Sequence, residues 1–181
     1  MAEGERGVLV PSGFALAGPT QRQVKQRDYT TRHQHFRSFD LAQIEKSVLS
    51  NVKGTDLNFF QFHHSYPQRR SSGAVERLIG WGHPVLIDKL KRKASSLCID
   101  GTFKCVPRPF HQCVVVMVYN RSSALFLPTI YILCTSRTAQ MYRNTLIFVE
   151  HLTDGLLKPE RVVRSFESPL LDAMLTRFRN A

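Results

Sequence analysis

The sequence contains no long hydrophobic run. No uninterrupted apolar stretch in its 181 residues approaches the roughly 20 residues that a membrane-spanning helix requires. Residues 1–18 likewise lack the basic start and the continuous apolar segment of a secretory signal. We therefore expect an intracellular protein without a membrane partner.

The four cysteines lack a metal-binding spacing. No two of them form a CxxC pair, and the adjacent His63 and His64 have no cysteine close to them in the sequence, so a structural zinc site is not expected. Three of the four cysteines lie inside apolar, strand-like runs, where a free cysteine behaves as a small hydrophobic residue. This usage favours a reducing compartment.

Acidic residues are scarce relative to basic ones. The 25 Lys and Arg residues against 14 Asp and Glu residues leave a formal net charge of +11 at pH 7. A chain with this excess attracts polyanions, so nucleic acid, and DNA first, is the leading class of partner. A basic surface that is merely solvated is the alternative that charge alone leaves open.

The length allows one buried core with a smaller appendage. Residues 1–37 are rich in Gly, Gln, Arg and Thr without a sustained apolar period, which predicts a flexible basic arm. Residues 38–93 are expected to form a lead-in of helices and short strands, with an amphipathic helix over 40–52 and another beginning at Pro84. Residues 94–181 then form the main domain.

The main domain has the clearest pattern. The expected elements are strands over 97–106, 111–119 and 124–134, a helix capped by Thr138, a strand over 161–166 and a helix beginning at Ser168. This β-β-β-α-β-α order predicts an α/β protein with a mixed sheet, whose fourth strand lies parallel beside the first. Pro128 inside the third strand predicts a sheet edge or a bulge there.

Asp100 is the one acid in an otherwise apolar strand pattern. A buried carboxylate costs several kcal/mol unless a cation, a metal or hydrogen bonds compensate it. Asp100 is therefore expected to be either a metal ligand or a structural residue paired with a neighbour such as Lys104. The fold prediction places Asp100 near Ser165, because the two lie at corresponding ends of adjacent parallel strands.

Five ordered segments resemble a known family. They are Asp100-Gly101-Thr102-Phe103-Lys104, Pro107 to Gln112, Leu127 to Tyr131, Tyr142-Arg143 and Val162 to Glu167. Together, over about residues 78–178, they resemble the MULE transposase domain of Mutator-like elements. The resemblance implies a ribonuclease-H-like fold, a location in the nucleus, and DDE-type cutting and joining of DNA with two divalent ions, usually Mg²⁺.

The resemblance also assigns roles to residues. Asp100 takes the place of the first catalytic acid and would be a metal ligand. Ser165 occupies the position of the second acid, where a hydroxyl cannot supply the charge, and Glu167 two residues later is a weak substitute. The third acid of the family would lie beyond Ala181, so the domain is incomplete at its C-terminus. Strand transfer by this chain alone is therefore not expected.

Three interpretations stay open at this point. The chain is an inactive transposase-derived domain, a non-enzymatic nucleic-acid-binding or domesticated regulatory protein, or a nuclease that uses Asp100 with Glu167. In each, Lys104, Arg108 and Arg164 line a DNA-facing edge or are solvated cations. A homo-oligomer, or association with a full-length transposase, is compatible with the first two.

Overall fold

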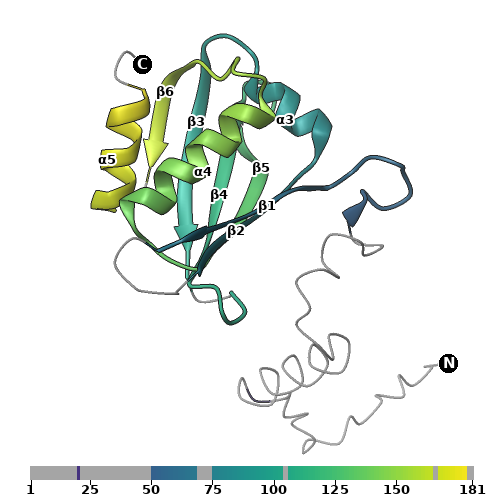
Figure 1. Ribbon diagram of the computed structural model, residues 1–181. Helices are drawn as coiled ribbons and strands as arrows, with labels where there is room; N and C mark the ends of the chain where they lie inside the picture. Colours follow the sequence, from purple (N-terminus) through teal and green to yellow (C-terminus); the bar gives the residue numbers. More distant parts are fainter. Residues whose placement is uncertain (1–19, 21–49, 69–74, 104–105, 165–166, 179–181) are drawn as a thin grey trace, which may run out of the picture. The chain divides into compact units, whose positions relative to one another are not determined.

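The structure is a computed structural model that describes Thr20 and residues 50–68, 75–103, 106–164 and 167–178. Almost all of the expected arm over 1–37, and most of the helix expected over 40–52, lie outside these residues. The described elements are β1 (Phe60–Pro67), β2 (Val75–Gly82), α3 (Pro84–Leu90), β3 (Ser95–Thr102), β4 (Gln112–Asn120), β5 (Leu125–Cys134), α4 (Ala139–Leu152), β6 (Pro159–Arg164) and α5 (Ser168–Arg177) (Figure 1).

The strands form one mixed sheet in the order β1-β2-β5-β4-β3-β6. All neighbours are antiparallel except β3 and β6, which are parallel. This confirms the predicted β-β-β-α-β-α order and the placement of the fourth strand of that series beside the first. The hairpin of β1 and β2, from the expected lead-in, extends the same sheet beyond β5. The strand expected to reach residue 106 ends earlier, at Thr102.

Pro128 lies at a β-bulge, which is one of the two positions, sheet edge or bulge, that the sequence predicted for it. The pairing of β4 with β5 shifts register between Val116 and Met117, so Thr129 is the extra residue on β5. The Thr129 hydroxyl donates to the Val116 carbonyl at 2.7 Å. β5 is an interior strand, so the edge alternative was wrong. The pairing of β5 with β2 covers only residues 130–134. Pro128 lies outside that segment, so its missing N–H costs no hydrogen bond to β2.

The ends of α4 and α5 follow local sequence signals. The Thr138 side chain accepts a hydrogen bond from the Met141 N–H at 3.2 Å, which caps α4. Gly155, at φ +70°, ends the helix with an N–H bond to the Glu150 carbonyl at 2.9 Å. Pro169 lies in the first turn of α5, as expected. None of the helices in the described segments is both long and apolar enough to span a membrane.

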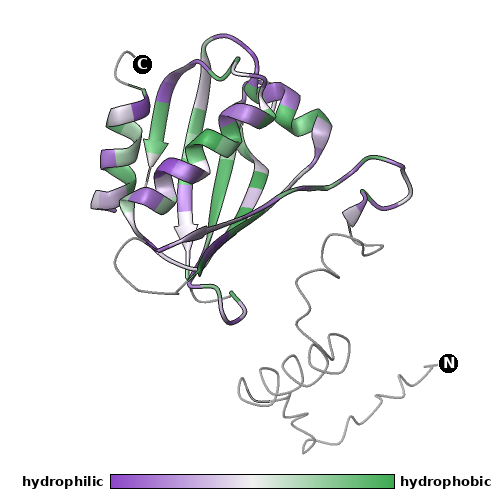
Figure 2. Ribbon diagram, viewed as in Figure 1, coloured by the Kyte–Doolittle hydropathy of each residue, from purple (hydrophilic) through white to green (hydrophobic). Residues whose placement is uncertain are grey.

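Most of the hydrophobic core lies on one face of the sheet, although Ile79, which pairs with Leu133 and points to the other face, is also fully buried. Alternate residues of β3, β4 and β5 point to this face and pack against the buried stripe of α4, with contributions from α3 and α5. Figure 1 shows α4 crossing this face, and Figure 2 shows the concentration of hydrophobic residues in the central strands. We call it the covered face, and the opposite side of the sheet the open face.

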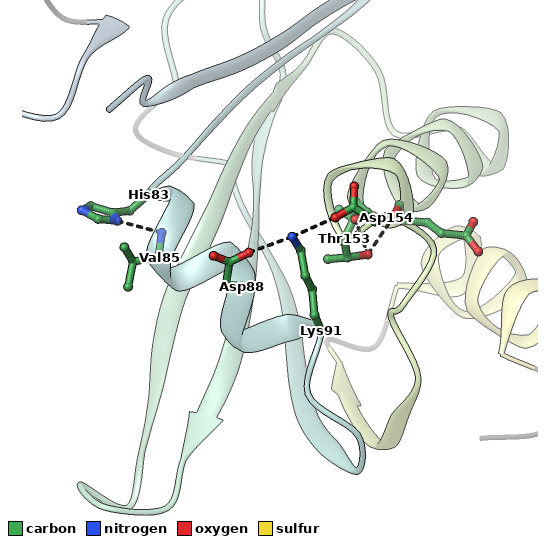
Figure 3. Close-up of polar contacts among 8 residues, drawn as sticks. His83, Val85, Asp88, Lys91, Thr153 and Asp154 are labelled. Carbon is green, nitrogen blue, oxygen red and sulfur yellow. Dashed lines mark hydrogen bonds and ion pairs between the residues drawn. The ribbon is translucent and has the colours of Figure 1, made fainter. Parts of the chain in front are cut away.

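Lys91 links the end of α3 to the end of α4. Its Nζ lies 2.7 Å from Asp88 Oδ1 and 2.9 Å from Asp154 Oδ2, as Figure 3 shows. Hydrogen bonds to these two carboxylates raise the pKa of Lys91 above its ordinary value. At the other end of α3, His83 Nδ1 accepts the Val85 N–H at 3.2 Å and caps the helix.

Candidate functional site

Asp100 lies near the carboxyl end of β3, and its side chain is exposed. Strand alternation along β3 directs Ile99 into the core and Asp100 to the open face. The premise that this acid is buried was therefore wrong, because the described helices pack on the other side. Asp100 Oδ1 accepts a hydrogen bond from the Gly101 N–H at 2.9 Å.

The parallel pairing of β3 with β6 ends beside Asp100. Ile99 is the last residue of β3 paired with β6, and its partner is Arg164. Asp100 and Ser165 each follow directly after this pair in the chain. Ser165 and Lys104 lie outside the described residues, so the pairs that they were expected to form with Asp100 stay predictions.

Glu167 is placed differently from the expectation. The resemblance assigned it as a weak substitute for the second acid, on the face of Ser165 if the strand continued that far. β6 ends at Arg164, and Glu167 is the residue that precedes α5. Its side chain makes no capping hydrogen bond with that helix. Its carboxylate instead accepts a hydrogen bond from the hydroxyl of Tyr142 on α4. Glu167 therefore belongs to a structural contact between the two helices.

Tyr142 connects Glu167 to further buried polar groups. Its hydroxyl lies 3.0 Å from Gln112 Oε1, and Gln112 Nε2 donates to the Ser136 carbonyl at 3.1 Å. The Ser136 hydroxyl donates in turn to the Glu76 carboxylate at 2.8 Å. We call the whole set the polar chain, and its members are Tyr66, Glu76, Gln112, Ser136, Tyr142 and Glu167.

The polar chain satisfies two strongly buried polar residues. Glu76 is nearly inaccessible and accepts a second hydrogen bond, at 2.5 Å, from the Tyr66 hydroxyl. Gln112 is fully buried. A buried polar group without a hydrogen-bond partner lowers the stability of the fold. The polar chain therefore fixes how β1, β2, β4, α4 and α5 pack together. The resemblance had included Gln112 and Tyr142 without a role, and Glu76 had no local signal, because its partner Ser136 lies 60 residues away.

The polar chain predicts an alkaline transition. Burial, followed by the hydrogen bonds to Glu167 and Glu76, raises the pKa of Tyr142 and that of Tyr66 above the ordinary value of 10.0. Because the pKa of each hydroxyl is higher in the folded than in the unfolded chain, its contribution to the free energy of unfolding is complete below pH 10. This contribution is lost as the pH rises above 10. In a titration followed at 295 nm, two of the five tyrosines should ionise late. Tyr142→Phe should remove one late step, and loss of a step near pH 10 instead would contradict the raised pKa of Tyr142.

The predicted cations are only partly described. Arg108 is exposed in the loop between β3 and β4. Lys104 and the Arg164 side chain lie outside the described atoms, so their DNA contacts stay predictions. Sequence reasoning missed Arg137, whose guanidinium lies 3.8 Å from the centre of the Phe103 ring.

The described residues do not fit a two-magnesium centre. They contain no group of three or more His, Cys, Asp or Glu side chains placed to hold a metal ion. Among the acids named from the sequence, Asp100 is exposed and Glu167 is bonded to Tyr142. Two ions about 3.5–4 Å apart need several carboxylates between them.

Known proteins provide no neighbour for this arrangement. No family model, no curated protein and no solved structure matches the chain.

Proposed function

We propose that this chain is a transposase-derived domain, ribonuclease-H-like in fold, that binds DNA in the nucleus without cutting it. The observation that supports the proposal most is the strand arrangement. Three antiparallel strands, a crossover helix and a fourth strand parallel to the first follow one another, with Asp100 at the carboxyl end of the first. This is the arrangement that the hydrophobic pattern of the main domain led us to expect, and the MULE resemblance implies a ribonuclease-H-like fold for the same residues.

Charge supports DNA as the partner. The net charge of +11 attracts phosphates, and Arg108 is exposed in the loop that follows β3. In sheets with parallel strands, ligands commonly bind outside the carboxyl ends of those strands. β3 and β6 are the parallel pair, so Arg108 stands near the end of the sheet where a ligand would be expected.

The replacement of the second acid supports binding without cleavage. Ser165 stands where the family resemblance calls for the second acid, and a hydroxyl brings no charge to a divalent ion. Glu167, the weak substitute, is held by Tyr142. Among the acids that the resemblance assigns in this sequence, Asp100 is therefore the one left for a reaction that needs several.

Salt dependence of DNA binding tests the proposal. The full chain is titrated into a labelled 20-base-pair duplex by fluorescence anisotropy between 50 and 300 mM KCl. We expect the logarithm of the affinity to fall linearly with the logarithm of the salt concentration, with a slope of about −0.9 for each phosphate neutralised. Arg108→Ala should reduce the slope by about 1. The matched control is Arg92→Ala, at an exposed position beyond α3, which should leave it unchanged. Absence of binding at 50 mM KCl would overturn the proposal.

A cleavage assay tests the second part of the proposal, that the chain does not cut DNA. The same duplex is incubated with the chain and Mg²⁺ or Mn²⁺, and we expect it to stay intact. Metal-dependent nicking that disappears in Asp100→Asn would show that the chain cuts DNA, and the non-cutting part of the proposal would then fall.

A further inference from the structure

A row of aromatic side chains crosses the open face. Phe60 on β1 pairs with Trp81 on β2, and Trp81 pairs with Tyr131 on β5. The row continues through Val115 on β4 and ends at Asp100 on β3. Directly paired residues point to the same side of a sheet, so these five side chains share the open face with Asp100 at one end.

The rings of this row are accessible. Tyr131 is 39% exposed, and Trp81 and Phe60 are half-buried. The Phe60 and Trp81 rings lie 6.3 Å apart in an edge arrangement. The three rings come from three neighbouring strands, whose backbones lie about 4.8 Å apart. A sheet with one solvated face ordinarily carries polar side chains there, so this aromatic row marks an interaction surface.

The chemistry of the face favours a single-stranded nucleic acid over a protein. Aromatic rings offer stacking surfaces for unpaired bases, whatever their sequence. Strand alternation places Arg77 on β2 and Arg161 on β6 on the same face, where their charges can meet phosphates. Asp100 is the acidic side chain that the described strands direct to this face. The net charge of the whole chain is +11, which also favours a polyanion over a neutral partner.

We propose that the open face is a stacking platform for single-stranded nucleic acid, with bases on Tyr131, Trp81 and Phe60 and phosphates beside Arg77 and Arg161. The inference rests on the proposed nucleic-acid-binding function and names the form of strand that is bound. The bound nucleic-acid strand runs across the β-sheet along the aromatic row, toward Asp100 at its end.

Trp81 makes the test direct, because it is the only tryptophan in the chain. Its emission is followed while the full chain is titrated, at 50 mM KCl, with 12-nucleotide oligo(dT), 12-nucleotide oligo(U) or a 12-base-pair duplex. We expect one or both single strands to quench Trp81 and the duplex to leave its emission nearly unchanged. The single strand that binds more tightly identifies the sugar that the platform prefers.

Variants of Tyr131 supply the second measurement. Tyr131→Ala should weaken oligo(dT) or oligo(U) binding by about 5- to 150-fold, the loss of one stacked base, whereas Tyr131→Phe keeps the ring and should stay within about threefold of wild type. The control is Leu175→Ala, at an exposed apolar position on α5. It should bind like the wild type.

The outcomes separate this inference from the proposed function. Duplex binding with no quenching of Trp81 by either single strand would overturn the platform and leave the proposed function standing, whereas absence of all binding would remove both. Self-association in light scattering that Tyr131→Ala abolishes, without single-strand quenching, would show that the face binds a second copy of the chain, and would also overturn the inference. If Tyr131→Ala does not fold, quenching in the wild type decides.

Discussion

Replacement of Leu146 by alanine is expected to lower the free energy of unfolding by about 2–5 kcal/mol. Leu146 is only 2% exposed and lies in the stripe of α4 that packs on the covered face of the sheet. The loss combines the transfer free energy of the removed atoms with the cavity that they leave. Urea unfolding of the full chain, followed by far-UV circular dichroism, measures it.

Ile147→Ala is the matched control. Ile147 is the next residue of the same helix and is 39% exposed, so its truncation should cost less than about 1 kcal/mol. Equal and small losses in both variants would mean that α4 does not pack on the sheet as described. The core of the main domain would then need another account.

Gln112→Leu is expected to lower the free energy of unfolding by about 1–3 kcal/mol. Gln112 is fully buried, and leucine would leave the Ser136 carbonyl without its bond from Gln112, whereas the Tyr142 hydroxyl would keep its bond to Glu167. Each buried polar group left without a partner costs about 1–3 kcal/mol. The same urea experiment measures the loss, and the tyrosine titration should show an altered ionisation of Tyr142 if its surroundings have changed.

Gln140→Leu separates burial from residue type. Gln140 lies in the first turn of α4, is half-buried, and bonds to Asn144 one turn later at 2.9 Å. Such a pair contributes about 0.2–0.5 kcal/mol, so the variant should be nearly neutral. A Gln112→Leu variant as stable as the wild type would show that the polar chain does not hold the elements together.

Much of the main domain could be predicted because its signals are local. Thr138 caps a helix, Gly155 ends it, and Pro169 starts the next, each through bonds or dihedral preferences that act within a few residues. The bulge at Pro128 follows from the same kind of local rule. The hairpin of β1 and β2 was indicated only weakly, and its place beside β5 depends on a distant pairing that no local pattern reports.

The candidate site was harder to predict, because its contacts are distant in sequence. The alternation along β3 separates Ile99 from Asp100 correctly, but it does not tell which of the two faces the helices will cover. The resemblance assigned Glu167 as a weak substitute for an acid, whereas β6 ends at Arg164 and a buried tyrosine 25 residues away donates to its carboxylate. The aromatic row on the open face has the same origin, because four strand pairings bring its members together.

The sequence by itself determined the order and type of the elements from β3 to α5 and the excess of positive charge. Only the tertiary structure decided that Asp100 faces solvent, that Glu167 bonds to Tyr142 and that Phe60, Trp81 and Tyr131 form one row. The physical reason is range. Hydrophobic period, caps and turns act over a few residues, whereas burial and side-chain partners depend on which distant segments pack together.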